Sequence, residues 1–490
     1  MSAPNILLFI ADGLRGQTLA PDSQVVAPNV RALAAGGIQV DNAYTPLPTC
    51  SPARASLMTG LLPHNHGVLQ VEHVADADQC VLRVDKPHWA QRLQGAGYQT
   101  AYFGKWHIER SLKLVDFGWE VGEPLGQEAH RKSSEQGMAS ESALDPELSR
   151  YHQGPPGYND TLHYGVTDVP PEERGISAPT DAAIAYLKDA PSDRPWCCVA
   201  SYYEPNEAMI VGREAYERYD VDRLRLSANL RDDFADRPNL YKRQQQIFAD
   251  LSDDEWRQAL ACYYGRITEI DAQLGRLLRV LDETGARDNT IVVFTADHGK
   301  YVGSHGFEAH NVGPFEEIYN IPLVVAGPGI ASNVRTNARI GLHDLCPTLI
   351  ELAGAEPIDV PDSRSCCELL RDPAVNEQAF DSGYAEYHGT RFPLAQRIYW
   401  QGDWKFVFNG FDFDELYNLA ADPAEMRNLA GDPEQADRVC SMMSEIWTRL
   451  EKTGDRALLN SHYYSMRFAA VGPNKTPRGM RYDAIEHVPI

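Results

Sequence analysis

The chain has 490 residues, of which 43% are hydrophobic, and its acidic residues outnumber the basic ones by 69 to 45, for a net charge of −24. A chain of this length and apolar content is globular, and it usually forms more than one structural unit. The negative charge argues against nucleic acids and anionic membranes as partners, because neither gains counterion release from an acidic surface. A small anionic substrate remains compatible with a local basic pocket.

The cysteine content and the N-terminal residues together indicate the compartment. The N-terminus lacks a basic segment, and the apolar run from Ile6 to Ala11 is shorter than the apolar core of a signal peptide. No run of residues reaches the length of a membrane-spanning helix. Nine cysteines, including two adjacent pairs, fit neither a disulfide framework nor a CxxC metal site. We therefore expect a cytoplasmic protein with reduced thiols.

Short apolar runs alternate with helical patterns over the first two-thirds of the chain, as in a parallel sheet covered on both faces. The longest helix is predicted to begin at Ser252, whose capping box includes Glu255, and to end at Gly285. The expected strands cover residues 5–11, 37–45, 98–104, 194–203, 289–296 and 321–329. The other expected helices cover residues 27–35 and 88–94, the segment that follows Pro52, and residues 343–353.

These elements predict an α/β fold with a large central, mostly parallel mixed sheet flanked by helices. We expect a catalytic α/β domain at residues 1–375, with a long surface insertion at residues 118–174 that lacks a clear period. A smaller C-terminal α+β subdomain at residues 376–460 is predicted to contain a short antiparallel sheet followed by helix. The irregular tail at residues 461–490 favours subunit packing in a homo-oligomer, a dimer or a tetramer.

Two of the expected strands end in the dipeptide Ala-Asp, at Asp12 and at Asp297. Functional groups of such sheets gather beyond the carboxyl ends of the strands. A buried carboxylate must be paired or bound to metal, and His298 would complete a nitrogen and oxygen ligand set for a divalent ion. The residues alone leave a second interpretation open, in which Asp12 caps a helix and Asp-His-Gly forms a turn.

Lys105 and His107 lie two residues apart after another expected strand. In an extended segment their side chains would share a face, where a cation and a titratable base suit an anionic substrate and proton transfer. A solvated loop explains the same residues.

Cys50 lies in the stretch "PLPTCSPARASLMTG", with Pro52 and Arg54 close behind it. One interpretation is a buried cysteine at a helix entrance, with the proline in the first turn. Another is a thiolate nucleophile whose pKa is lowered by the helix N-terminus and by Arg54.

These motifs together resemble the sulfatase family, within the alkaline-phosphatase-like superfamily. The stretch "CSPAR" fits the C-x-P-[SA]-R signature in which the cysteine is oxidised to formylglycine. The blocks "GYQTAYFGKWH", "TIVVFTADHG", "EEIYNIPLVVAGPG", "DLCPTLIELAG" and "LYNLAADPAEMRNLA" follow in the order of the family. The resemblance covers residues 5 to about 430 and implies an alkaline-phosphatase-like fold.

The resemblance implies a metal centre with one divalent ion per chain, calcium or manganese. Asp12, Asp297, His298 and the modified Cys50 would hold this ion. Many sulfatases have a second aspartate where this chain has Gly13, so the four-ligand set is more similar to that of the phosphonate monoester hydrolase branch. The imidazole ligand favours manganese or a similar ion over calcium.

The resemblance also implies the roles of the groups around the nucleophile. Cys50 would become a formylglycine hydrate, matured by a formylglycine-generating enzyme, and one of its hydroxyls would attack the substrate. Arg54 would stabilise the diol, and Lys105 would pair with the substrate anion. His107 would take the proton of the second hydroxyl, so that the covalent intermediate is resolved by elimination of sulfate.

Two further positions depart from the family. Asn206 stands where many relatives have a histidine that contacts the bridging oxygen. An asparagine cannot protonate a leaving group, which fits an activated, phenol-like alcohol. Relatives usually carry a lysine shortly after Asp-His-Gly, and His310 is the nearest candidate for its place.

The sequence therefore predicts a sulfuric ester hydrolase, similar to arylsulfatases, that acts on a small anionic ester. The alternative is a phosphonate monoester and phosphodiester hydrolase on the same site, with promiscuity between the two. A third reading is a metal-binding relative without turnover.

Overall fold

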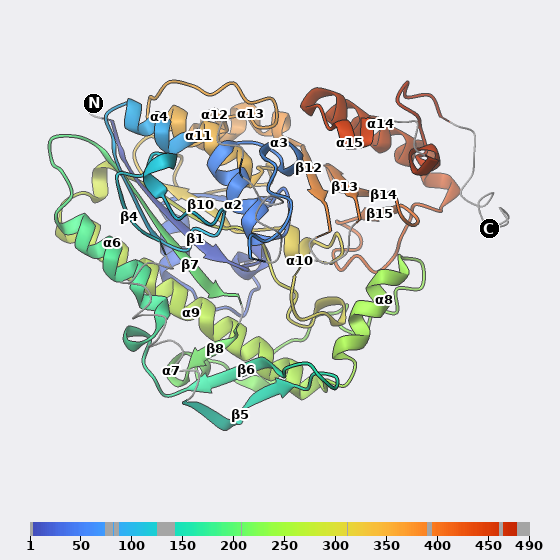
Figure 1. Cartoon of the computed structure of the whole chain (residues 1–490), viewed down its shortest axis with the longest axis horizontal. Helices are drawn as coiled ribbons and strands as arrows, with labels where there is room; N and C mark the ends of the chain where they lie inside the picture. Colours follow the sequence, from blue (N-terminus) through green and yellow to red (C-terminus); the bar gives the residue numbers. More distant parts are fainter. Residues whose placement is uncertain are drawn as a thin grey trace.

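An eight-stranded sheet forms the centre of the molecule in the computed structural model (Figure 1). The structure describes residues 3–73, 82, 88–124, 143–206, 208–310, 312–389, 394–459 and 464–477. The strand order is β11-β2-β10-β9-β1-β7-β3-β4. These strands are β1 (Asn5–Asp12), β2 (Gly37–Val40), β3 (Gln99–Gly104), β4 (Val121–Pro124), β7 (Trp196–Pro205), β9 (Thr290–Ala296), β10 (Leu323–Ala326) and β11 (Val334–Thr336). Only β10 runs antiparallel to its neighbours in this sheet, so the expected mostly parallel mixed sheet is confirmed.

Helices cover both faces of this sheet, which explains why its central strands are continuous apolar runs. In Figure 1, α6 and α9 lie on one side of the sheet and α2, α4 and α11 on the other. The helices are α1 (Pro28–Ala35), α2 (Cys50–Thr59), α4 (Trp89–Gly95), α6 (Ala178–Lys188), α9 (Asp253–Glu283) and α11 (Leu345–Leu352). The predicted capping box of α9 is confirmed, because the backbone N–H of Glu255 donates to Ser252 Oγ over 3.2 Å.

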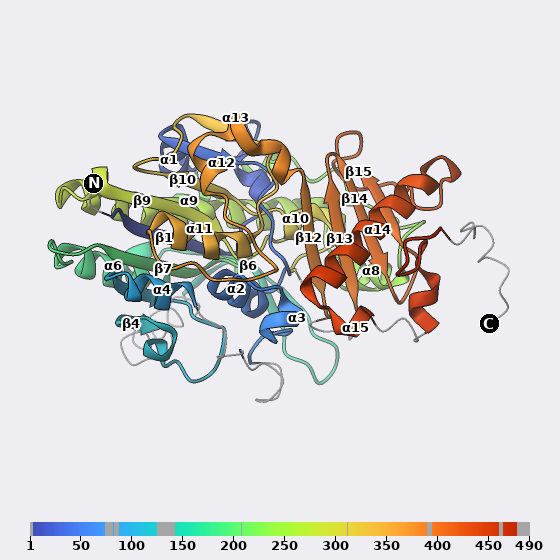
Figure 2. The same ribbon diagram turned by 90° about the horizontal axis from the view of Figure 1, so that it is seen from above.

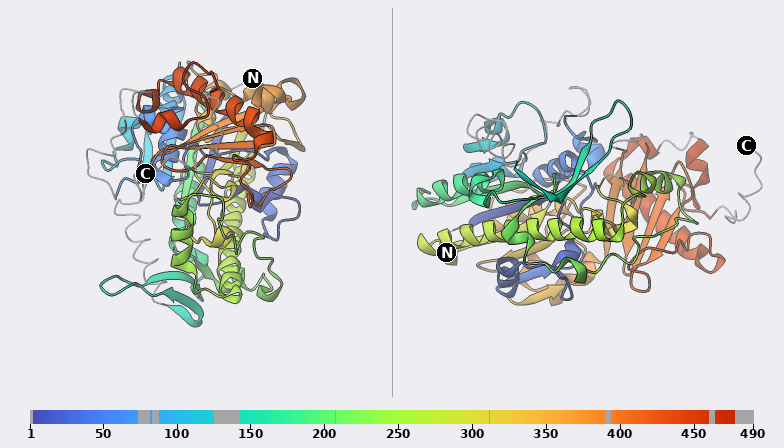
Figure 3. Two further views of the ribbon diagram at one scale, coloured as in Figure 1. Left: turned by 90° about the vertical axis from the view of Figure 1, so that its right-hand side faces the viewer. Right: turned by 90° about the horizontal axis from the view of Figure 1, so that it is seen from below.

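The expected insertion contains more regular structure than its composition predicts. Besides β4, it forms β5 (Leu144–His152) and β6 (Thr161–Thr167), which build a three-stranded sheet with β8 (Ile210–Gly212). Figure 3 shows this small sheet at the edge of the molecule. Strand β5 has no residue classed as buried, and its pairing with β6 shifts register twice, so no apolar alternation marks it in the sequence.

A four-stranded antiparallel sheet builds the C-terminal part, as expected (Figure 2). Its strands are β12 (Ser382–Tyr387), β13 (Gln396–Gln401), β14 (Trp404–Asn409) and β15 (Glu415–Asn418), and the helices α14 (Ala436–Thr453) and α15 (Arg456–Leu459) follow them. The described part of the tail packs against α14 of the same chain, where Trp447 Nε1 donates to the carbonyl of Val471 over 2.9 Å. The rest of the predicted tail lies outside the described residues.

Within the described residues, none of the helices has the length and apolar character needed to cross a membrane. The eight cysteines in these segments are all free thiols.

A buried ion pair joins the two parts of the chain next to α2. His64, in the short helix α3 (Pro63–His66), places Nδ1 2.5 Å from Glu386 Oε1 and Nε2 3.3 Å from the carbonyl of Thr453. Because both ring nitrogens face acceptors, the charged imidazolium is favoured. Burial would lower the pKa of His64, but Glu386 outweighs burial and raises this pKa to about 9.

We expect the His64→Gln variant to be less stable by up to about 3 kcal/mol at pH 6. The folded-state pKa of His64 lies above the unfolded value, so its stabilisation is complete below about pH 6.5 and is lost as the pH rises through about 9. Denaturant midpoints at pH 6 and pH 9.5 measure the difference. The control is His388→Gln: burial lowers the pKa of His388, so its effect should change by less than about 1 kcal/mol between these pH values, and in the direction opposite to that of His64→Gln. An effect of His64→Gln that is equal at both pH values would contradict the ion pair.

Candidate active site

The carboxyl ends of two neighbouring strands bring the predicted acids together. Strands β1 and β9 pair in parallel with Ala11 opposite Ala296, so Asp12 and Asp297 follow side by side. The first residue of α2, Cys50, lies against them. One ligand atom each from Asp12, Cys50, Asp297 and His298 forms a buried group in which all atoms lie within 4.8 Å of one another.

The two carboxylates point one oxygen each toward a common space. Asp297 Oδ2 accepts from Arg54, while its Oδ1 accepts from the backbone N–H of His298 over 2.9 Å. Asp12 Oδ2 is held by Arg54 and Lys105, whereas Asp12 Oδ1 is buried without a hydrogen-bond partner in the described structure. Burying a carboxylate oxygen without a partner is costly, so this oxygen fits a cation ligand.

His298 adds a nitrogen with the orientation of a metal ligand. Its Nδ1 lies 2.8 Å from the carbonyl of Gly299, which assigns the ring proton to Nδ1 and leaves the lone pair on Nε2. This Nε2 lies 3.3 Å from Cys50 Sγ and 3.6 Å from Asp12 Oδ1. Burial would lower the pKa of His298, but the charge of Asp297 contributes to raising it to about 9, so its surroundings favour a positive charge at Nε2, either a proton or a metal ion in its place. The donor set fits a divalent ion such as manganese.

Arg54 and Lys105 supply the cations of the site. The Arg54 guanidinium is fully buried and donates to both carboxylates, to Ser201 Oγ and to two backbone carbonyls. Lys105 Nζ bonds Asp12 and lies 4.6 Å from the centre of the Tyr203 ring. Burial opposes the charge of Lys105, but Asp12 outweighs it, and the pKa of the lysine is raised.

His107 lies beside the cations, although the expected extended segment is wrong. Its backbone is left-handed, with φ of 55°, so the chain turns after β3 instead of alternating its side chains. The imidazole Nε2 lies 3.1 Å from His73 Nδ1, and Nδ1 is buried without a partner in the described structure. Burial, with help from the charge of Lys105, lowers the pKa of His107 to about 2, so the ring is neutral.

Asn206 and His310 both lie near the centre. A Cβ added to Gly13, whose φ is 71°, would lie 3.2 Å from Asn206 Oδ1, so the asparagine packs where a side chain at position 13 would begin. His310 stacks on His298 with ring centres 4.0 Å apart. One nitrogen of each ring and Cys50 Sγ lie within 4.8 Å of one another.

Lys300 is a residue that the sequence interpretation missed. It is fully buried, and its Nζ lies 3.5 Å from Asn206 Oδ1 and 3.1 Å from Glu308 Oε1. The lysine directly follows Gly299, whereas the lysine of the family was sought further along the chain. Its place directly after Asp-His-Gly is the feature of the sequence from which it could have been predicted as a site residue.

A cavity of about 500 Å³ lies beside the site, and His310 is one of the residues that line it. Its lining is mostly apolar and aromatic. Of the three histidines in the lining, His163 is neutral because burial lowers its pKa to about 3. The apolar walls come from the small sheet, the segment around α8 (Asn239–Gln245) and the loop after β9, namely Leu162, Met209, Ile247, Phe248, Phe307 and Val312.

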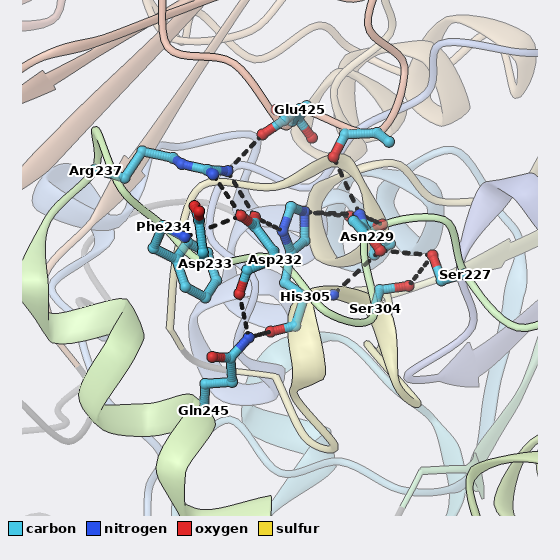
Figure 4. A network of polar contacts seen from close by, with 12 residues as sticks. Ser227, Asn229, Asp232, Asp233, Phe234, Arg237, Gln245, Ser304, His305 and Glu425 are labelled. Atoms are coloured by element: carbon cyan, nitrogen blue, oxygen red, sulfur yellow. Dashed lines mark hydrogen bonds and ion pairs between the residues drawn. The ribbon is translucent and has the colours of Figure 1, made fainter. Parts of the chain in front are cut away.

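A buried polar network fixes the loop that carries this wall (Figure 4). His305 Nδ1 lies 2.7 Å from Asp232 Oδ2, and Asp232 also accepts from Arg237 over 2.6 Å. Arg237 donates in turn to the carbonyl of Glu425, in the C-terminal part, over 2.7 Å. The network therefore links one wall of the cavity to the C-terminal part of the chain.

Comparison with known proteins places these features in a family. A family model described as Sulfatase matches residues 4–355. A second model, described as N-sulphoglucosamine sulphohydrolase, C-terminal, matches residues 303–453. Among curated relatives, a choline-sulfatase of Rhizobium meliloti (strain 1021) is 28% identical over 465 residues, which cover 88% of this chain and 83% of the relative.

Solved structures share the fold, and two of them are informative here. One is a protein in complex with its substrate D-glucosamine-2-N,6-O-disulfate, with a TM-score of 0.75 and 20% identity over 93% of this chain and 99% of the other. The other is a phosphonate monoester hydrolase from Silicibacter pomeroyi, with a TM-score of 0.76 and 22% identity over 93% and 96% of the two chains.

Proposed function

The chain belongs to the sulfatase family, and we propose on that premise that it hydrolyses sulfate esters with residue 50, matured from cysteine to formylglycine, as its nucleophile. The observation that carries the proposal is the convergence of buried oxygen and nitrogen ligands from Asp12, Asp297 and His298 on Cys50 Sγ. A thiol in that position would be one more metal ligand, whereas a geminal diol adds an oxygen nucleophile.

We propose that Asp12, Asp297, His298 and residue 50 hold one divalent ion. The unpartnered Oδ1 of Asp12 and the lone pair of His298 Nε2 support this assignment. When bound, such an ion supplies Lewis acidity and positive charge to the reacting group.

The protein side chains then perform two steps. In the first, one hydroxyl of residue 50 loses its proton to water and its oxygen attacks sulfur while Lys105 pairs with the sulfate oxygens. The bond from sulfur to the alcohol oxygen breaks, and the alcohol leaves with that pair of electrons and takes up a proton from water. In the second, His107 accepts the proton of the remaining hydroxyl. The pair of electrons from that O–H bond forms the aldehyde, and sulfate leaves with the electrons of its bond to carbon. Arg54 holds Asp12 and Asp297 in place during both steps.

The surroundings favour an aryl ester as substrate. Asn206 can donate a hydrogen bond to the leaving oxygen but cannot protonate it, so an alcohol of low pKa leaves most readily. The cavity beside His310 has apolar and aromatic walls suited to a ring.

A second candidate function is hydrolysis of phosphonate monoesters and phosphodiesters. Gly13 stands where many sulfatases have a further carboxylate, so the chain has four candidate ligands. This number is similar to that of phosphonate monoester hydrolases and favours the second function. The same nucleophile and cations suit tetrahedral phosphorus.

Two measurements test the proposal. We expect kcat/KM for nitrophenyl sulfate to equal or exceed that for phenyl nitrophenyl phosphonate, and an aldehyde at residue 50 in protein produced with a formylglycine-generating enzyme. A sulfatase activity orders of magnitude below the phosphonate activity would favour the second candidate. An unmodified thiol at residue 50 in that protein would contradict both and favour a relative without turnover.

We also propose that the protein works in the cytoplasm, because its described cysteines are all free thiols, and that it acts as a homo-oligomer. Its partner in maturation would be a formylglycine-generating enzyme.

A further inference from the structure

His73 is an exposed histidine that contacts His107, the proposed base of the site, whose side chain is mostly covered. Its Nδ1 lies 3.1 Å from Nε2 of His107, and the two rings are nearly parallel, at 13°, with centres 5.2 Å apart. The opposite nitrogen of His107, Nδ1, is buried and has no hydrogen-bond partner among the residues described. The ring of His107 therefore has one nitrogen toward the protein interior and one toward an exposed imidazole.

The segment that carries His73 is anchored to the nucleophile helix. The backbone N–H of Glu72 donates to Ser51 Oγ over 3.1 Å, and Ser51 directly follows Cys50. On its other side, Arg110 Nε donates to the carbonyl of Glu72 over 3.0 Å. Both contacts fix the backbone of Glu72, the residue before His73, and so place the His73 side chain beside the site, as a group that orients another requires.

The hydrogen bond between the two imidazoles decides which nitrogen of His107 is basic. In one arrangement, His107 Nε2 donates to His73 Nδ1, and His107 Nδ1 keeps a lone pair toward the interior. In the other, His73 Nδ1 donates, and His107 Nδ1 carries a hydrogen and cannot accept a proton. Only the first arrangement provides a base for the elimination step. Glu72, whose Oε1 lies 4.0 Å from His107 Nε2, adds negative charge on the same side.

We propose that His73 is a positioning residue that holds His107 in its basic tautomer and carries the released proton to solvent. This inference rests on the proposed function. When the O–H bond of residue 50 breaks, the proton binds His107 Nδ1, and the Nε2 proton of His107 moves to His73 Nδ1. The Nε2 proton of His73 then leaves to water, so one proton enters the pair and one departs. Before the next turnover the pair resets: His107 Nδ1 loses its proton to water in the emptied site, His73 Nδ1 returns its proton to His107 Nε2, and His73 Nε2 takes up a proton from solvent. The electrons of the O–H bond form the aldehyde, as in the step above.

The test compares His73→Ala with wild-type and His107→Ala proteins, all matured with a formylglycine-generating enzyme. We expect His73→Ala to lower kcat for nitrophenyl sulfate by about 10- to 100-fold, within the range of general acid–base effects, with KM changed less than about twofold. Added imidazole at tens of millimolar should restore much of the lost kcat, because the position is open to solvent. His107→Ala should show no such rescue, because only about 10% of the His107 side chain is exposed and its basic atom, Nδ1, is buried.

The outcomes separate this inference from the proposed function. Wild-type protein without activity on sulfate or phosphonate esters would overturn the proposed function, and this inference with it. An active wild type together with a His73→Ala variant of unchanged kcat would overturn the role of His73 alone. The role of His73 would also be overturned if His73→Ala had a lowered kcat that imidazole does not restore. This holds when the melting temperature and the aldehyde content at residue 50 match the wild type, since that pattern indicates a packing effect only.

Discussion

The Cys50→Ser variant is expected to lose multiple turnover, with steady-state kcat lower by on the order of 10⁴-fold, the scale typical of a lost nucleophile. A serine hydroxyl can attack sulfur and release one equivalent of alcohol. It has no second hydroxyl, so His107 finds no proton to remove and the sulfate ester on residue 50 cannot eliminate. The metal ligands Asp12, Asp297 and His298 are unchanged.

Rapid mixing with nitrophenyl sulfate measures this result as a burst of at most one nitrophenol per subunit, followed by a stalled protein carrying one sulfate by mass spectrometry. Cys440→Ser is the matched control, because Cys440 is a partly exposed thiol in α14 and its replacement should leave kcat unchanged. Sustained turnover by Cys50→Ser would refute the elimination step.

The Arg54→Ala variant is expected to lose both stability and activity. Arg54 donates to Asp12 and Asp297, which are fully buried, so its removal leaves two carboxylates with less compensating charge. Breaking a buried pair on one side typically costs about 3–5 kcal/mol. Arg54→Lys should recover only part of this loss, because an ammonium cannot reach the several acceptors that the planar guanidinium bonds.

Denaturant unfolding in the absence and presence of manganese measures this effect, because a bound cation should offset part of the lost charge. Arg218→Ala is the control, since Arg218 is exposed and, among the residues that the structure describes, forms an ion pair only with Glu214, over 2.9 Å, in a surface contact worth less than about 1 kcal/mol. A loss of stability no larger than that of the control would show that Arg54 does not hold the carboxylates.

Local patterns were enough to predict the main elements. The strand at residues 5–11 is a nearly continuous apolar run because helices cover both faces of its sheet. The start of helix α9 is marked in the sequence by the capping box at Ser252. The sheet of β5 and β6 was missed because exposed residues and register shifts erase the alternation that marks a strand. The turn after β3 was missed because no residue type forces the left-handed backbone of His107.

The sequence by itself determined the candidate ligands, through strand-end acids and a nucleophile motif that resemble one family. Only the tertiary structure decided how these groups meet. Parallel pairing of β1 with β9 joins Asp12 to Asp297, which are far apart in the chain, and brings both to Arg54. The exposed His73 has no local signature, because it acts through a contact that chain folding creates. For Lys300 the sequence offers only its place directly after Asp-His-Gly, and the contacts that bring it to Asn206 come from folding. Apolar periodicity and capping are local properties, whereas the basicity of an imidazole depends on the neighbour that its other nitrogen meets.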